Sequence, residues 1–245
     1  MSAKLPNTPS KAPSNTEADV PGIPNRPFPL KRIVAGLLIV AAAFAALAVG
    51  LPKTADAKDA IGLSDTQAKQ VQRIEAYLNA ISTLSSRFMQ VTSMGQFAQG
   101  DFLMARPGRM RIDYDEPTPV VIVSDGTWVM YKDTELDQIS HMLLSQVPAS
   151  MFIGETVDFF GDDLLITDFE SAAGVQRLTL QRADDPMEGS LTLVFEAKPL
   201  QLKKWAVTDA QGVTTTVSLL GPQFGVPVDK SLFKVETQSM KRQSD

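Results

Sequence analysis

The stretch from Gly100 to Ser140 constrains the fold of this chain more than any other. It consists of short segments rich in β-branched, aromatic and methionine residues, with turns at short intervals between them. Such segments are typical of consecutive antiparallel strands. Arg106-Pro107-Gly108 marks one sharp turn, and Asp125-Gly126 predicts a hairpin with a two-residue type I′ loop. The stretch therefore predicts an antiparallel sheet with a face rich in soft apolar side chains.

Strand patterns continue through the rest of the chain, on both sides of one interruption. We expect strands at residues 87–92, 96–105, 110–114, 119–123, 127–132 and 136–141, and again at 164–169, 175–182, 190–196, 202–208, 213–220 and 232–235. Between the two groups, Pro148 should divide residues 142–153 into two short helical turns. An antiparallel sheet of this many strands tends to curl or close.

One amphipathic helix should precede the sheet, at about residues 65–81. Ser64 and Gln67 have the spacing of a capping box, which marks a helix N-terminus. The apolar residues that follow at helical spacing are Ala68, Val71, Ile74, Leu78 and Ile81. This stripe predicts packing on one face of the sheet.

The first 57 residues differ in composition from the rest. Residues 1–32 are rich in proline and lack apolar periodicity, so we expect disorder there. Residues 33–57 hold an apolar run after Lys31-Arg32 and then Ala55-Asp56-Ala57, which together resemble a secretory signal cleaved after Ala57. The alternative is an uncleaved membrane anchor. In both cases residues 58–245 should form one domain outside the cytoplasm.

Charge and cysteine content exclude several kinds of protein. The chain has no cysteine, which excludes disulfides, thiol chemistry and a lipidated N-terminal cysteine. Its net charge is −5, and the first 57 residues carry six basic against three acidic side chains, so the remainder has a charge of −8. This acidic balance argues against binding to nucleic acid or to an anionic membrane surface.

Patterns typical of catalytic sites are absent from the sequence. His141 is the only histidine, and no nucleophile elbow, zinc-binding motif or phosphate-binding loop is present. Asp162-Asp163 and Asp184-Asp185 lie beside turn residues, which favours solvated turn charges over acid–base catalysis. We therefore expect no enzyme activity, no metal site and no cofactor.

Methionine and aromatic residues gather in the first half of the predicted domain. Methionine is flexible and polarizable, so it lines adaptable binding surfaces as well as irregular cores. The pattern leaves two interpretations open, an ordinary core and an apolar cavity between the curled sheet and the helical segments. Its members include Phe88, Met89, Met94, Phe97, Phe102, Met104, Met110, Trp128, Met130, Met142, Met151 and Phe152.

The order of these motifs resembles the LolA family, periplasmic carriers that move lipoproteins between the two membranes of Gram-negative bacteria. The resemblance covers about residues 68–235. The residues that carry it are Phe88-Met89-Gln90, Gly100-Asp101-Phe102, Arg106-Pro107-Gly108, Arg111, Tyr114, Pro117, Ser124-Asp125-Gly126, Tyr131 and Leu136-Asp137-Gln138.

The resemblance implies a mainly β fold with α, an incomplete, unclosed antiparallel β-barrel of about 11 strands, with an N-terminal helix and short lid helices over an apolar cavity. It implies that Arg106 hydrogen-bonds to the lid and latches it; the residue-level alternative for Arg106 is a turn residue before Pro107. The resemblance also implies a cavity for acyl chains. The residues that would line this cavity are Phe88, Phe102, Met104, Met110, Trp128, Met130, Leu143, Leu144, Met151 and Phe152.

The implied partners are lipidated lipoproteins, an inner-membrane ATP-driven lipoprotein-releasing complex and an outer-membrane lipoprotein receptor. We expect a monomer in the periplasm. The receptor of the same system needs a lipidated cysteine, which this sequence lacks. Met110 and Ile112 stand where such carriers commonly have an aromatic pair. A carrier of another lipid, or a lipid-binding envelope sensor with the same fold, is the alternative.

Overall fold

The computed structural model describes residues 61–234. The predicted disordered segment, the apolar run and the cleavage site lie outside the described residues. In chain order the elements are α2 (Asp65–Ala80), β1 (Thr83–Thr92), β2 (Phe97–Ala105), β3 (Arg109–Tyr114), β4 (Val120–Asp125), β5 (Trp128–Asp133), β6 (Gln138–Leu143), η2 (Leu144–Gln146), α3 (Ser150–Ile153), β7 (Leu164–Ala172), β8 (Val175–Arg182), η3 (Pro186–Glu188), β9 (Gly189–Ala197), β10 (Leu200–Asp209), β11 (Thr214–Phe224) and η4 (Lys230–Phe233). No helix among these residues is both long and apolar enough to cross a membrane.

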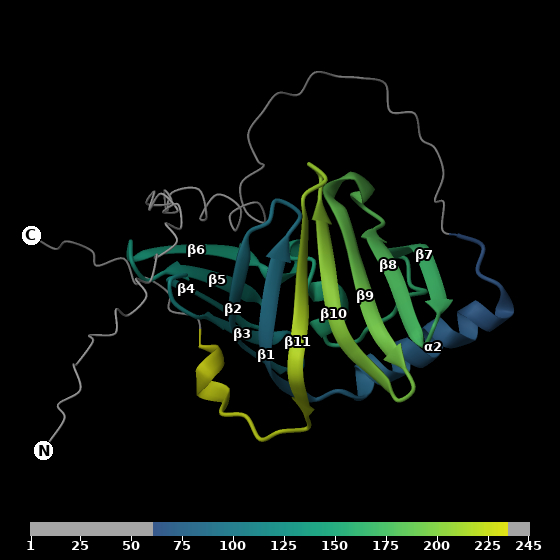
Figure 1. Cartoon of the computed structure of the whole chain (residues 1–245), viewed down its shortest axis with the longest axis horizontal. Coiled ribbons are helices and arrows are strands. Elements are labelled where there is room, and N and C mark those ends of the chain that lie inside the picture. The colour runs from purple at the N-terminus through teal and green to yellow at the C-terminus, as the bar shows by residue number, and fades with distance from the viewer. Residues whose placement is uncertain (1–60, 235–245) are drawn as a thin grey trace, which may run out of the picture.

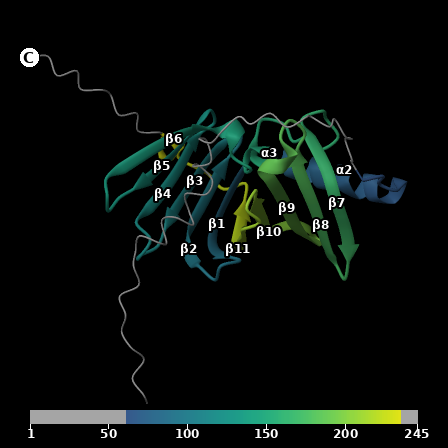
Figure 2. The ribbon, with the colours of Figure 1, turned by 90° about the horizontal axis from the view of Figure 1, so that it is seen from above.

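All eleven strands belong to one antiparallel sheet that does not close. Their spatial order is β6-β5-β4-β3-β2-β1-β11-β10-β9-β8-β7, so β6 and β7 are the two edges. Figure 2 shows these edges at opposite sides of a strongly curved sheet. This confirms the predicted mainly β fold and the unclosed barrel.

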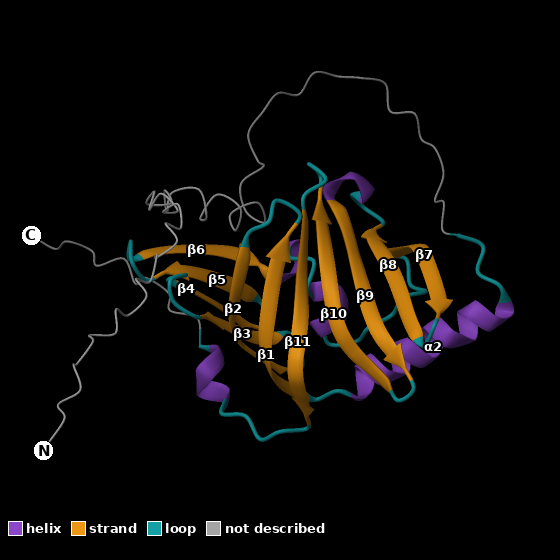
Figure 3. Ribbon diagram, in the orientation of Figure 1, coloured by secondary structure: helices purple, strands orange, loops and turns teal. Residues whose placement is uncertain are grey.

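The N-terminal helix packs on one face of this sheet, which we call the inner face. The predicted capping box is present, since the Ser64 and Gln67 side chains each bond the other's backbone. Val71, Ile74 and Leu78 of α2 are buried among sheet residues. Figure 3 shows the helix crossing behind β7 to β10. The helical stripe read from the sequence is therefore the surface that covers this half of the inner face.

The predicted helical interruption is confirmed as two short turns, η2 and α3, on either side of Pro148. We call residues 144–153 the lid. Its Phe152 packs against Trp205 of β10 with ring centroids 5.4 Å apart, and Phe102 of β2 reaches the same tryptophan at 5.3 Å. Aromatic residues from the lid and from both halves of the sheet thus meet in one core.

The hairpin at Asp125-Gly126 is confirmed, but the predicted type I′ turn is wrong. Ser124 pairs with Val129, so four residues separate the paired positions. Asp125 lacks the positive φ that a type I′ turn requires, whereas Gly126 has φ +109°. The Asp125 carboxylate accepts backbone N–H groups of Thr127 and Trp128, both at 2.8 Å. This side-chain turn makes the tighter backbone turn unnecessary.

The predicted strand at 232–235 is also wrong within the described residues. Residues 230–233 form the single turn η4, which begins where the Asp229 side chain accepts the N–H of Ser231 at 2.8 Å. Its Phe233 is buried, and η4 contacts β3 and β4. A helix cap and one apolar anchor therefore decide the local structure.

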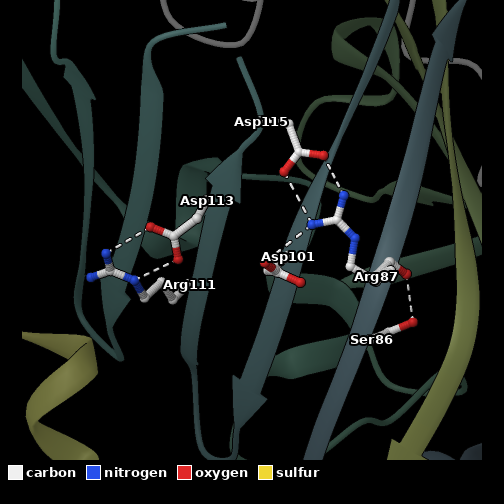
Figure 4. A network of polar contacts seen from close by, with 6 residues as sticks. All are labelled: Ser86, Arg87, Asp101, Arg111, Asp113 and Asp115. Carbon is white, nitrogen blue, oxygen red and sulfur yellow. Dashed lines mark hydrogen bonds and ion pairs between the residues drawn. The ribbon is translucent and has the colours of Figure 1, made fainter. Parts of the chain in front are cut away.

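Ion pairs cover the outer face of β1 to β3, opposite to α2 (Figure 4). Arg87 lies between Asp101, at 3.1 Å, and Asp115, to which it makes two hydrogen bonds. The neighbouring Arg111 makes two bonds of 2.7 Å to Asp113. These side chains are exposed or half-buried. They keep this face solvated and add little to stability.

Gly100 is a position where the sheet leaves no room for a side chain. A Cβ there would lie 2.0 Å from the Asp113 carbonyl oxygen and 2.8 Å from Cε1 of Phe88. We expect Gly100→Ala to lower the free energy of unfolding by about 1–3 kcal/mol, as overpacking does, measured by chemical denaturation. Gly62→Ala is the control, because its Cβ would meet nothing within 4 Å. Equal effects of the two substitutions would contradict the close packing at Gly100.

Candidate functional site

Arg106 bridges the two helical elements that cover the inner face. Its Nη1 donates to the carbonyl of Leu78 at 3.0 Å and to Oδ1 of Asn79 at 3.2 Å, both at the end of α2. Its Nη2 donates to the carbonyl of Phe152 in α3 at 2.7 Å. Burial lowers the pKa of Arg106, but a guanidinium stays charged in proteins. A charged group at the end of β2 therefore holds the lid to the helix.

Two packed turns set the position of this arginine. Gly108, two residues on, has φ +67°, and a Cβ there would lie 2.8 Å from Cα of Gly126. The buried Ser124 hydroxyl donates to the carbonyl of Gly108 at 2.8 Å. Gly108 itself donates its N–H to the Ile153 carbonyl at 2.8 Å. The Arg-Pro-Gly and Asp-Gly turns thus form one unit, and it holds α3 from the backbone as well.

The chain beyond α3 is tied to α2 by side chains that the sequence did not reveal. Asn79 makes a two-way contact with Val157, donating to its carbonyl at 2.8 Å and accepting its N–H at 2.9 Å. Glu75 accepts the N–H of Phe159 at 2.7 Å. Asn79 therefore joins α2, Arg106 and the segment after the lid.

Seven of the ten residues predicted to line an acyl-chain cavity belong to or pack against the core under α2 and the lid. Met151 is half-buried and the other six are buried. They come from β1, β2, β3, η2 and α3, so the structure brings together residues up to 64 positions apart in the chain (Phe88 to Phe152). The seven are Phe88, Phe102, Met104, Met110, Leu144, Met151 and Phe152. Their binding of acyl chains remains a prediction.

The other three, Trp128, Met130 and Leu143, lie on the outer face, which corrects their predicted place. Directly paired residues in an antiparallel sheet share a face. Trp128 pairs with Leu143, and Met130 pairs through Val123 with Arg111, the outer-face residue of the ion pairs. Trp128 and Leu143 are 46% and 39% exposed. These three residues were predicted from their apolar character alone. Successive residues along β5 and β6 lie on opposite faces of the sheet, and this alternation was not considered.

The inner face of β3 to β6 is instead a half-buried apolar surface. Ile112, Ile122 and Tyr131 follow from Phe102 by direct pairing across the strands, whereas Tyr114 pairs with Gly100 and Met142 with Val129. All of these inner-face residues except Tyr131 pack against the buried core. In β5, every second residue starting from Val129 lies on this inner face, so the alternation along the sequence could have identified Tyr131. The apolar members of this surface, here called the inner margin, are Ile112, Tyr114, Ile122, Tyr131 and Met142.

Polar groups are embedded in this surface. The Tyr114 hydroxyl donates to Oε1 of Gln90 at 2.8 Å, and Gln90 is only 7% exposed. The Tyr131 hydroxyl is shielded from solvent and has no hydrogen-bond partner in the described part of the chain. Burial is the main cause that raises the pKa of both phenols. Both tyrosines are therefore neutral hydrogen-bond donors at physiological pH.

The residues considered for catalysis lie elsewhere. His141 is exposed on the outer face of β6, where it pairs with Met130. Asp162, Asp163, Asp184 and Asp185 are exposed and lie outside the strands, and Asp184 bonds Arg182. No group of three His, Asp or Glu side chains within residues 61–234 could hold a metal ion. The functional geometry is therefore the apolar inner face and its helical cover.

The Arg106 bridge predicts a local effect of its removal. We expect Arg106→Leu to lower the free energy of unfolding by about 2–3 kcal/mol, because it leaves buried carbonyls unpaired. Amide hydrogen exchange should rise at Ser150–Ile153 more than in β8. Arg177→Leu is the control, since Arg177 makes an exposed ion pair with Glu170 on the sheet. Unchanged exchange in the lid of the Arg106 variant would show that the bridge does not hold it.

A family model and the similar sequences agree on one family. A family model described as outer membrane lipoprotein carrier protein LolA matches residues 79–236. The chain is 26% identical over 185 residues to an outer-membrane lipoprotein carrier protein of Azotobacter vinelandii, covering 71% of this chain and 88% of that protein. Identity to the carrier protein of Halorhodospira halophila is 27% over 185 residues, covering 72% and 86%, and to that of Pseudomonas fluorescens 29% over 178 residues, covering 69% and 84%. The protein therefore belongs to the LolA family of outer membrane lipoprotein carrier proteins.

Proposed function

We propose that this protein is a carrier that binds the acyl chains of lipoproteins in the periplasm and shields them from water. The observation that carries the proposal is the inner face, an apolar surface covered by a short lid that one guanidinium joins to α2. Family membership supports lipoproteins as the cargo. The carrier performs no covalent chemistry and needs no cofactor.

The energetics of acyl chains explain why such a carrier is needed. Burying hydrocarbon is worth about 0.8 kcal/mol per methylene, so one common acyl chain is held in a membrane by roughly 10 kcal/mol. Two or three chains on one protein will not cross water unaided. The core under the lid and the half-buried inner margin offer a continuous apolar surface for them. Methionines 104, 110, 142 and 151 make this surface adaptable.

Arg106 sets the balance between a closed and an open lid in this proposal. In the closed form the guanidinium bonds two backbone carbonyls and the Asn79 side chain. Chains that enter beneath Phe152 displace α3 and cost these charge-assisted hydrogen bonds, each worth about 1.5–3 kcal/mol. Cargo is then bound less tightly than an apolar surface alone would bind it. That weaker binding favours transfer to a receptor.

The carrier takes cargo from an ATP-driven releasing complex of the inner membrane and delivers it to an outer-membrane receptor. It works as a monomer after cleavage of the predicted signal following Ala57. The acidic charge of residues 58–245 suits repeated departure from anionic membranes, which a basic protein would leave more slowly.

A release assay tests the carrier role. The purified protein is incubated with energised spheroplasts that hold labelled outer-membrane lipoproteins, and the supernatant is examined for a soluble complex. We expect a complex of one protein with one lipoprotein. Albumin at the same concentration is the control for non-specific extraction. Lipoprotein that stays in the membrane while the protein still binds acyl probes would replace this proposal with another lipid cargo or a sensing role.

The role of Arg106 is tested by separating loading from delivery. Arg106→Leu should still load lipoprotein but should deliver it to outer membranes at least about tenfold more slowly, because the lost hydrogen bonds no longer weaken cargo binding. Labelled lipoprotein in the outer membrane is counted over time. Arg177→Leu is again the control and should deliver normally. Equal delivery by both variants would remove Arg106 from the mechanism.

A further inference from the structure

We propose that the Tyr131 hydroxyl donates a hydrogen bond to an ester or amide carbonyl of the acylated cargo, and so recognises the acyl linkage and not only the hydrocarbon. This inference rests on the proposed carrier function. It names a polar contact within an otherwise apolar surface. The ligand class is a neutral acyl ester or amide.

The place of Tyr131 supports this role. It lies on the inner face of β5, paired with Ile122 of β4 on one side and with Ser140 of β6 on the other. Ile122 is half-buried at the core margin, whereas Ser140 is exposed. Tyr131 therefore stands at the border between the apolar surface and water. In an acylated molecule, the carbonyl occupies the same border between chain and head group.

The hydroxyl of Tyr131 differs from those of the other two tyrosines. Tyr114 donates to Gln90 at 2.8 Å, and Tyr77 accepts the N–H of Leu202 at 3.1 Å. Tyr131 has no such partner among residues 61–234, although its oxygen is shielded from solvent. An unpaired buried hydroxyl costs free energy that an acceptor on a ligand would recover. Phenylalanine would avoid that cost if the position served packing alone.

The surroundings favour a neutral acceptor over an anion. Asp133, two residues along the same strand and on the same face, is 3% exposed and accepts the N–H groups of Glu135 and Leu136. Its negative charge adds to burial in raising the pKa of Tyr131, so the phenol keeps its proton. The same charge repels a phosphate or a free carboxylate. An ester or amide carbonyl accepts the hydrogen bond without bringing a second negative charge.

The test compares two ligands that differ only in the linkage. Dioctanoylglycerol has ester carbonyls, and dioctylglycerol has ether oxygens with chains of the same length. Each is titrated against the full-length protein loaded with a fluorescent apolar dye, and displacement gives the affinity. We expect Tyr131→Phe to weaken binding of the ester by about three- to tenfold, the worth of one hydrogen bond. Binding of the ether should stay within about twofold.

The ligand-free stability of the variants separates recognition from a structural role. Tyr131→Phe should unfold at the same denaturant concentration as the parent protein or at a higher one, because it removes an unpaired hydroxyl. Tyr77→Phe is the matched control. It removes a hydroxyl that has a partner outside the inner margin, so its stability should fall while its ratio of ester to ether affinity stays unchanged.

Three results would overturn the inference in distinguishable ways. If neither ligand displaces the dye from the protein, the proposed carrier function fails together with the inference. If both ligands bind and Tyr131→Phe leaves the ratio of affinities unchanged, the carrier function stands and the Tyr131 contact is wrong. A clear loss of stability in Tyr131→Phe would also contradict an unpaired hydroxyl kept for the ligand.

Discussion

The rest of the structure depends on the contact between α2 and the inner face of the sheet. In this contact the helix buries Val71, Ile74 and Leu78. An open sheet of this curvature exposes an apolar inner face unless another element covers it. The helix covers the half formed by β7 to β10, and the lid continues the cover toward β1. In the half formed by β3 to β6, Met110 and Val129 are buried in the core, and the other apolar residues of the inner face lie at its margin. The incomplete cover therefore creates the apolar surface on which the proposed function rests.

Much of the fold could be predicted because its signals are local. The capping box at Ser64, the break at Pro148 and the short apolar segments each depend on neighbours in the sequence, and the structure has them where they were expected. The turn after Ser124 and the segment around Phe233 were predicted wrongly for a related reason. In both cases a single aspartate side chain bonds backbone N–H groups and overrides the general preference of its neighbours.

The site was harder to predict than the fold. Arg106 was named only through a family resemblance, and its acceptors lie 28 and 46 residues away along the chain. Asn79 and Glu75 hold the segment after the lid across 78 and 84 residues, which no local pattern indicates. Trp128 and Met130 were assigned to the wrong face because apolar side chains occur on both faces of β5. Only the register of all strands from β2 to β6 fixes which side each residue takes.

The strand order also limits how far the molecule can open. β6 and β7 are the two free edges of the sheet, and they are consecutive strands, so residues 144–163 form a tether that runs from one rim of the opening to the other. Twenty extended residues would reach about 70 Å, but Asn79 and Glu75 hold Val157 and Phe159 of this tether at α2. The usable slack is therefore the stretch before Val157. In the proposed carrier function, that stretch is the part of the tether that moves when cargo enters.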